Sequence, residues 1–361
     1  LLIFPAVLAS ADEKHGPKRV LTIFVFKQGL PWAYRIEESL RTALASETSY
    51  PIDLNFEHAD LSRFSDKTYL SKLVDLYRYK YSKQKIDLLI AVGDESTDLL
   101  IKFGKELYEH IPVVVITTGR KSLPRQLVRS NIIKFSWGFD LEGTVNLIER
   151  TQPKTRHLFV VSGSSLSDRG VKRSAFEAFG EHAGRLDIQY LSDLAIEDLM
   201  AKVANLPEDS ALLFLTFFRD ASGKYFVPRD VMSLVSEKAN APTFGIVDTY
   251  LGHGLVGGNL LSAEHQGRKY ADVIIRILKD GTLNGLESDE EYNPTMFDWR
   301  QLKRWSFNED RLPIGSIVRY REQSTWEDQN GKIIGAIGRI LAQASFLLLL
   351  LPHRAQRSRA E

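Results

Sequence analysis

The sequence predicts an α/β protein made of two doubly wound parallel-sheet lobes with a cleft between them, followed by a C-terminal transmembrane helix. Three observations predict the two lobes. Apolar runs alternate with amphipathic segments along most of the chain, which is typical of parallel sheets covered by helices. Residues 86–92 are apolar except at Asp87, as expected for a strand buried on both faces. The alternation breaks at the basic segment 120–130 and then begins again.

The elements before this break predict the first lobe. A helix with Ile36, Leu40 and Leu44 on one face follows the first strand. The central strand ends at Gly93, where a tight turn leads into another helix. The strands are expected at 19–26, 52–56, 86–92 and 112–119. Asp66 is placed to cap a further helix, whose apolar face is predicted to be Leu70, Leu73, Leu76 and Tyr77.

The elements after the break predict the second lobe. Residues 131–135 are expected to form the strand that crosses between the lobes, and four glycines in 248–258 indicate a loop packed closely against its surroundings. A strong amphipathic helix follows this loop and stops at Gly281. Further strands are expected at 157–163, 186–191, 211–216, 243–247 and 295–299, with helices at 141–150, 168–179, 196–203 and 231–239.

These elements divide the chain into six predicted parts. They are a signal-peptide remnant (1–11), the first lobe (18–125, with part of 259–282 packing back on it), the second lobe (131–258), a last strand, helix and tether (283–330), a transmembrane helix (333–351) and a cytoplasmic tail (352–361).

Composition narrows the class of protein. The 361 residues suffice for two domains with sizeable cores, and 47 basic against 46 acidic residues give a formal net charge of +1. This balance gives no reason to expect a nucleic-acid partner. The absence of cysteine excludes disulfides, thiolate nucleophiles and cysteine-ligated metals.

Both ends of the sequence predict an extracytoplasmic protein anchored in the inner membrane. Residues 1–8 are apolar and precede Ala9-Ser10-Ala11, which fits the tail and cleavage site of a signal peptide, although an ordinary buried strand or a frayed terminus is the alternative. Residues 333–351 have the length of a bilayer span and are followed by arginines, which places the main body outside. Arg339 within this run favours the alternative, a buried amphipathic helix.

Four segments carry a resemblance to a known family. They are 89–94 (Leu-Ile-Ala-Val-Gly-Asp), 160–164 (Val-Val-Ser-Gly-Ser), 243–248 with its Thr-Phe-Gly and Asp248, and the glycine loop 252–258. Their order resembles type I periplasmic binding proteins, and more closely the substrate-binding-protein-like family of ABC transporters that also forms the external sensor module of membrane histidine kinases. Segments 297–302 and 312–318 look like the sensor version, which leads into a transmembrane helix. No kinase or other output domain follows in this chain, so the output is expected in a longer protein or on another chain.

The candidate ligand-binding residues follow the predicted strands, because ligands of open α/β sheets bind beyond the carboxyl ends of the strands. Aromatic side chains suit a flat or apolar ligand part, aspartates suit an ammonium group, and the glycine–serine turn suits a carboxylate or phosphate. The candidates are Gln28, Trp32, Gly93, Asp94, Glu95, Thr117, Thr118, Ser162, Gly163, Ser164, Thr216, Phe217, Phe218, Asp248 and Tyr250.

Each candidate also has a structural interpretation. Asp94 and the serines fit helix capping, and Phe217 and Phe218 fit core packing. No histidine spacing suits a metal, and the Gly252, Gly254 and Gly257 pattern follows the last strand of a series, where a dinucleotide fingerprint does not occur. We therefore expect no cofactor and no metal.

The sequence predicts a small-ligand-binding sensor module and no enzyme, since it lacks any catalytic motif. Hinge closure on an amino-acid-like or aromatic ligand would be passed through 297–316 to the membrane helix and an output domain. The alternative is the substrate-binding component of an ABC transporter, with a permease as its partner. An enzyme that uses the same cleft is a third, less supported hypothesis.

Overall fold

The computed structural model describes residues 16–46, 50–64, 66–103, 108–118, 122–182, 184–283, 286 and 293–321, together with 337, 339–341 and 343. Leu1–Arg319 form one compact unit and Tyr320–Glu361 a second. The described fold belongs to the first unit, which holds two lobes. The expected signal-peptide remnant lies outside the described residues, as does most of the expected transmembrane helix. Within the described part of the chain, no helix is long and apolar enough to cross a bilayer.

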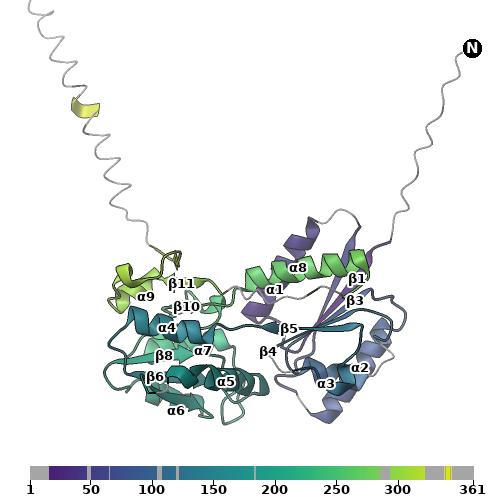
Figure 1. Cartoon of the computed structure of the whole chain (residues 1–361), viewed down its shortest axis with the longest axis horizontal. Coiled ribbons are helices and arrows are strands. Elements are labelled where there is room, and N and C mark those ends of the chain that lie inside the picture. The colour runs from purple at the N-terminus through teal and green to yellow at the C-terminus, as the bar shows by residue number, and fades with distance from the viewer. Residues whose placement is uncertain are drawn as a thin grey trace, which may run out of the picture. The chain divides into compact units, whose positions relative to one another are not determined.

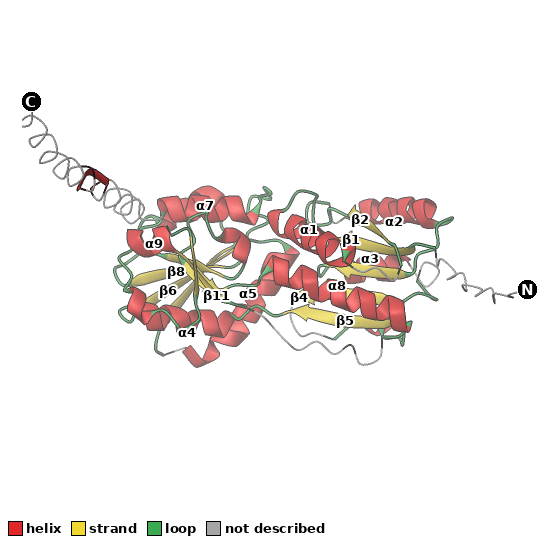
Figure 2. Ribbon diagram, turned by 90° about the horizontal axis from the view of Figure 1, so that it is seen from above, coloured by secondary structure: helices red, strands yellow, loops and turns green. Residues whose placement is uncertain are grey.

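The first lobe is built on a five-stranded parallel sheet of order β2-β1-β3-β4-β5 (Figures 1 and 2). Its strands are β1 (Lys18–Phe24), β2 (Ile52–His58), β3 (Leu88–Val92), β4 (Val113–Thr118) and β5 (Ile132–Trp137). Its helices are α1 (Pro31–Ala45), α2 (Lys67–Tyr81), α3 (Ser96–Phe103) and α8 (Ala263–Asp280), with a short 3₁₀ turn, η2 (Arg125–Leu127).

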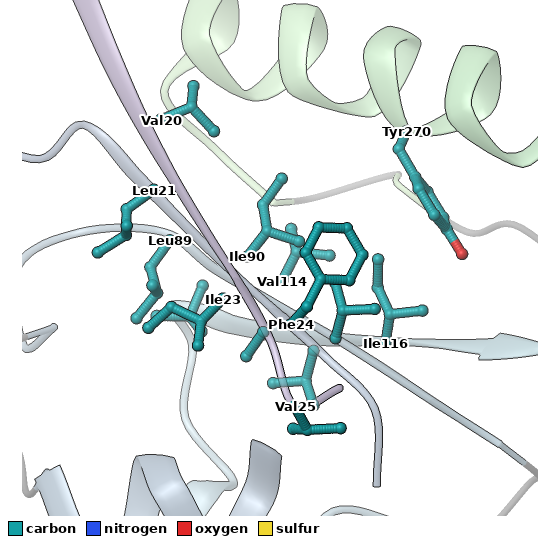
Figure 3. Close-up of a cluster of buried hydrophobic side chains, with 14 of the residues drawn as sticks. Val20, Leu21, Ile23, Phe24, Val25, Leu89, Ile90, Val114, Ile116 and Tyr270 are labelled. Carbon is teal, nitrogen blue, oxygen red and sulfur yellow. The ribbon is translucent and has the colours of Figure 1, made fainter. Parts of the chain in front are cut away.

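The core of this lobe is the apolar sheet itself. Every residue of β3 is buried, as the unbroken apolar run predicted. Side chains from β1, β3 and β4 meet Tyr270 of α8 in one cluster (Figure 3). Helices α1 and α8 lie side by side over one face of the sheet, and α2 and α3 lie over the other (Figures 1 and 2).

Helix α8 returns to the first lobe although it follows the second lobe in sequence. Gly267 permits its close approach to α1, since a Cβ there would lie 2.5 Å from the Cβ of Ser39. The Ser39 hydroxyl donates to the carbonyl of Glu264 at 2.8 Å. Gly281 ends α8 in the left-handed conformation, which confirms its predicted role as the stop of the helix.

The crossing between lobes comes later than the sequence suggested. We expected the second lobe to begin at residue 131, but β5 pairs with β4 over its whole length, from Ile132 to Trp137. Ile132 and Phe135 are buried in the core of the first lobe, which explains why this strand completes the first sheet. The chain crosses at 138–140, immediately before α4.

The second lobe contains a four-stranded parallel sheet of order β7-β6-β8-β9 and a smaller sheet of order β10-β11-β12. Its strands are β6 (His157–Ser162), β7 (Asp187–Ser192), β8 (Ser210–Phe214), β9 (Thr243–Gly245), β10 (Gly257–Asn259), β11 (Thr295–Asp298) and β12 (Ile317–Arg319). Its helices are α4 (Leu141–Thr151), α5 (Leu166–Ala178), α6 (Ile196–Val203), α7 (Pro228–Lys238) and α9 (Trp299–Arg304), with 3₁₀ turns η3 (Phe179–His182), η4 (Asp248–Tyr250) and η5 (Glu309–Arg311). The predicted α/β fold with two parallel sheets is confirmed.

The glycine loop packs as tightly as its composition predicted. A Cβ at Gly258 would lie 2.1 Å from the carbonyl oxygen of Gly245, and one at Gly257 would lie 2.4 Å from that of Met296. These glycines therefore allow the loop and β10 to run directly against neighbouring backbone.

Three connections join the lobes, and hydrogen bonds link them to one another. They are 138–140, 260–262 and the segment between α8 and β11. Asn259 donates to Asp140 at 2.6 Å and accepts from the Thr295 hydroxyl at 2.7 Å. Asn293 donates to the carbonyl of Gly138 at 2.8 Å. We call Gly138, Asp140, Asn259, Asn293 and Thr295 the hinge network.

Candidate functional site

A cavity of about 80 Å³ lies between the two lobes. Both lobes contribute to its wall, which is almost entirely apolar and carries one charged side chain, Arg229. The lining residues are Phe26, Leu30, Pro31, Trp32, Ala33, Phe139, Thr216, Phe218, Val227, Pro228, Arg229, Val247, Thr249, Tyr250 and Leu261. Five of these residues are aromatic, and aromatic walls suit a ring or another apolar group.

The aromatic residues reach the cavity from the ends of strands. Phe26 follows β1, and Phe218 lies in the loop after β8, so their stacked rings join the two lobes at a centroid distance of 5.4 Å. Trp32 lies in the first turn of α1. Tyr250 is fixed by a hydrogen bond from its hydroxyl to the carbonyl of Leu215 at 3.1 Å and by an edge contact with Phe214.

Asp168 holds the loop that carries Phe218. Its side chain is completely buried. The carboxylate accepts hydrogen bonds from the hydroxyl of Thr216 at 2.7 Å and from the backbone N–H groups of Phe218 at 3.0 Å and Arg219 at 3.3 Å. It also accepts from the N–H of Ser165 as part of the capping box of α5. Burial raises the pKa of Asp168, and these hydrogen bonds act in the opposite direction.

A second contact between the lobes is polar. Glu95, at the turn after β3, accepts the hydroxyl of Ser167 in the first turn of α5, with distances of 3.1 and 3.3 Å to its two oxygens. Burial raises the pKa of Glu95 to about 7. Lys134 in β5 interacts electrostatically with Asp94, and burial lowers the pKa of Lys134.

A third contact is an arm of the second lobe, residues 219–225, closed by a β-bridge between its ends. Arg219 donates to the carbonyl of Ser62 at 3.1 Å, and the Tyr225 hydroxyl donates to the carbonyl of Arg63 at 2.8 Å. The Arg219 guanidinium also lies 4.4 Å from the centre of the Tyr225 ring. Residues 219–225 are thus hydrogen-bonded to the loop after β2 in the first lobe.

The structure brings part of the predicted set together at the cavity: Trp32, Thr216, Phe218 and Tyr250. Gln28 follows β1 but is exposed, and Phe217 is buried in the core of the second lobe. Glu95 lies at the polar contact instead, and Gly93 and Asp94 precede it in the same turn. Thr117 is buried at the end of β4, and Thr118 follows it with its side chain outside the described part of the structure.

The turn 162–164 uses its polar groups within the second lobe. The Ser162 hydroxyl donates to the carbonyl of Asp168 at 3.2 Å, and the N–H of Gly163 donates to that of Thr216 at 2.8 Å. Ser164 donates its N–H to the carbonyl of Arg219 and its hydroxyl to that of Asp220, both at 2.7 Å. The N–H and hydroxyl groups that suggested a carboxylate or phosphate site therefore form hydrogen bonds to neighbouring loops of the same lobe.

Asp248 lies next to the cavity-lining segment 249–250 and is 8% exposed. One carboxylate oxygen accepts the N–H of Ala263 at 3.1 Å, and the other is buried without a hydrogen-bond partner in the described structure. Burial raises the pKa of Asp248, whereas the Arg35 guanidinium opposes this shift. Asp248 therefore holds the start of α8 by a hydrogen bond to one carboxylate oxygen, and the other oxygen accepts none in the described structure.

The sequence interpretation missed several cavity residues and the residue that organises them. Phe26 was assigned to the end of the first strand, and Phe139 and Arg229 lie between the predicted elements. Asp168 was assigned only to a helix start. Its capping-box spacing with Ser165 was visible in the sequence, but its second role depends on a loop 50 residues away. Within the described residues, no cluster of metal-ligating side chains occurs.

Comparisons with known proteins agree with this architecture. Neither protein-family models nor curated protein sequences match the chain. Solved structures do match. A conserved domain protein from Vibrio cholerae has a TM-score of 0.62 at 14% identity, covering 83% of this chain and 99% of that one. An ABC domain in complex with L-Trp from Streptococcus pneumonia has a TM-score of 0.60 at 13% identity, covering 84% and 100%. A ligand-free, open substrate-binding protein with adhesive properties from Clostridium difficile has a TM-score of 0.58 at 15% identity, covering 83% and 98%.

The chain has the fold of the type I periplasmic binding proteins. The resemblance inferred from the four sequence segments is confirmed at this level. The link to sensor modules of histidine kinases stays a prediction.

Proposed function

We propose that this protein is an extracytoplasmic binding module whose two lobes close on a small ligand with an aromatic or apolar part. The observation that carries the proposal is the cavity, because it is walled by aromatic side chains from both lobes. A cavity of about 80 Å³ holds only several water-sized groups. A ligand of amino-acid size therefore requires the lobes to part, as hinge closure does.

The unused oxygen of Asp248 and the guanidinium of Arg229 favour a ligand that also carries charge. The Asp248 oxygen suits an ammonium group, although it reaches a ligand only when the surrounding loop moves. Arg229 is the charged side chain of the cavity wall and suits a carboxylate. Together with the aromatic wall, this chemistry favours an aromatic amino acid or a close relative of one.

The hinge network supports the sensor role over the transporter role. Asn259 and Thr295 connect the hinge to β11, and β12 pairs with β11 in register up to Arg319. Closure therefore acts on the strand pair that leads toward 333–351, which we propose anchors the protein in the inner membrane. The alternative, delivery of the ligand to an ABC permease, requires no such connection.

Thermal unfolding of the full chain against amino acids, nucleobases, small acids and sugars tests ligand binding, with L-tryptophan as the first probe. A ligand at 100-fold its Kd stabilises by about 2.7 kcal/mol, which raises Tm by roughly 5–10 °C. We expect Phe218→Ala to weaken binding by at least about tenfold, since it removes the interlobe stack.

The neighbouring Phe217→Ala is the matched control. Phe217 is 1% exposed and packs in the core, so its loss lowers the free energy of unfolding by about 3–5 kcal/mol. We expect Phe218→Ala to cost much less stability. Equal affinities of wild type and Phe218→Ala for a ligand that shifts Tm would contradict the cavity as the binding site.

Hydrogen exchange separates the sensor from the transporter. For the sensor, ligand binding changes protection in β11 and β12, and Thr295→Val abolishes that change while binding persists. For the transporter component, the change is confined to the cavity loops. Protection in β11 and β12 that is the same with and without a saturating ligand would contradict the sensor role.

A further inference from the structure

Glu95 is a buried carboxyl group at the polar contact between the lobes, outside the ligand cavity. Its side chain is 7% exposed, and its partner Ser167, from the other lobe, is 5% exposed. Helix α5, which carries Ser167, packs against β4 of the first lobe. Both side chains are therefore buried by the meeting of the two lobes, and separation of the lobes returns Glu95 to water.

The groups around Glu95 do not offset the burial of a negative charge. Asp94 on the same turn and Asp168 on α5 are both acidic and oppose ionisation of Glu95. The Ser167 hydroxyl and the N–H of Glu95 itself favour the ionised form. Lys134 on β5 interacts electrostatically with Asp94. Desolvation is the largest effect, and the pKa of Glu95 rises from its ordinary value of 4.5 to about 7 in the closed lobes.

We propose that closure of the two lobes takes up one proton at Glu95. The carboxylate of the open form accepts a proton from solvent as Ser167 approaches, and the closed form holds the neutral acid. The inference rests on the lobe closure of the proposed function, but it does not depend on the identity of any ligand.

The sign of the pH dependence follows from the two protonation states. Below pH 4.5 Glu95 is protonated in both forms, and closure is independent of its charge. Between 4.5 and about 7 the open form is ionised and the closed form is not, so closure weakens as pH rises. The equilibrium constant for closure falls by up to about tenfold per pH unit in this window and then levels off.

A spin-label distance measurement between the lobes tests this directly in the ligand-free full chain. The chain contains no cysteine, so Lys72→Cys on α2 and Lys202→Cys on α6 give two exposed labelling sites without removing a carboxyl group. We expect the short-distance population to decrease as pH rises from 5 to 8. Glu95→Gln in the same background, neutral at every pH, should keep the lobes closed across the range.

Glu109→Gln is the matched control, since Glu109 is an exposed glutamate of the first lobe. It should reproduce the wild-type pH profile. A wild-type distance distribution that does not change with pH would overturn the proposal, as would a Glu95→Gln profile that follows the wild type. Because no ligand is added, these outcomes are independent of whether the cavity binds an aromatic molecule.

Discussion

Two turns of the molecule share one local design and serve different purposes. The turn after β3 and the turn after β6 each follow a buried strand, pass through a glycine and enter a helix with an acidic residue near its start. In the second lobe that acid, Asp168, lies five residues after Gly163, inside the first turn of α5, and is directed to its own lobe. In the first lobe Glu95 lies two residues after Gly93, ahead of α3, and reaches the other lobe.

The difference shows how the position of one carboxyl group decides its role. At the third position of α5, Asp168 completes a capping box and meets the neighbouring loop. Before the helix begins, Glu95 is held by the turn and faces the opposing helix terminus. Matched substitutions of the acidic residue, the glycine and a serine associated with each turn test this comparison.

Substitution of the two acidic residues is expected to give the largest difference in the free energy of unfolding. Asp168→Asn should lower the free energy of unfolding by about 3 kcal/mol or more, because an amide nitrogen would face backbone donors of Ser165 or Phe218 and leave them unsatisfied. Glu95→Gln should not destabilise the protein at pH 8, where burial of the ionised acid is unfavourable. Urea unfolding at pH 8 measures both. An Asp168→Asn variant within about 1 kcal/mol of wild type would show that the carboxylate does not hold the loop.

The glycines give an intermediate effect for two different reasons. Gly93 has φ of +109°, and a Cβ there would lie 2.1 Å from Cγ2 of Val25, so Gly93→Ala should cost about 1–3 kcal/mol through backbone strain. Gly163 has no such φ, but its Cβ would lie 2.4 Å from Asp168 and 2.7 Å from the carbonyl oxygen of Arg219. Gly163→Ala should therefore displace the loop that carries Phe218.

Urea unfolding of both alanine variants, followed by titration with the ligand that thermal unfolding identifies, distinguishes these reasons. Gly93→Ala should lose stability and keep the affinity of wild type. Gly163→Ala should lose both. Unchanged affinity in Gly163→Ala would mean that the loop position does not depend on this turn.

Much of the fold could be predicted because buried parallel strands leave a clear pattern in sequence. The apolar runs of β3, β6 and β8 identified both sheets, and the spacing of Ile36, Leu40 and Leu44 identified the buried face of α1. The face of α2 was predicted less well. Leu76 is 51% exposed, while Val74 and Tyr81 are buried. The buried face of α2 is set by residues spaced four apart, namely Leu73, Tyr77 and Tyr81.

The candidate site could be predicted only as a set of loops. The strand pattern identified a set of loops, and Trp32, Thr216, Phe218 and Tyr250 from those loops line the cavity. It does not decide which side chain within a loop turns toward the cavity. Phe217 and Phe218 are adjacent and equally apolar, yet one enters the core and the other the cavity. That choice depends on the hydrogen bonds from the loop to Asp168, which are contacts of tertiary structure.

The serines give the smallest effect on stability and the sharpest comparison. The Ser164 hydroxyl bonds to carbonyls of Arg219 and Asp220, so Ser164→Ala should cost about 0.5–1.5 kcal/mol and leave lobe closure unchanged. Ser167→Ala removes the donor that favours ionised Glu95 and should have a similarly small effect on unfolding. Loss of this hydrogen bond should nevertheless raise the pKa of Glu95 in the closed form. The equilibrium constant for closure should then stop falling at a higher pH than in the wild type. Urea unfolding and the interlobe distance measurement together check the pair. If Ser164→Ala moves the pH profile as far as Ser167→Ala does, the contrast between an internal brace and an interlobe contact is wrong.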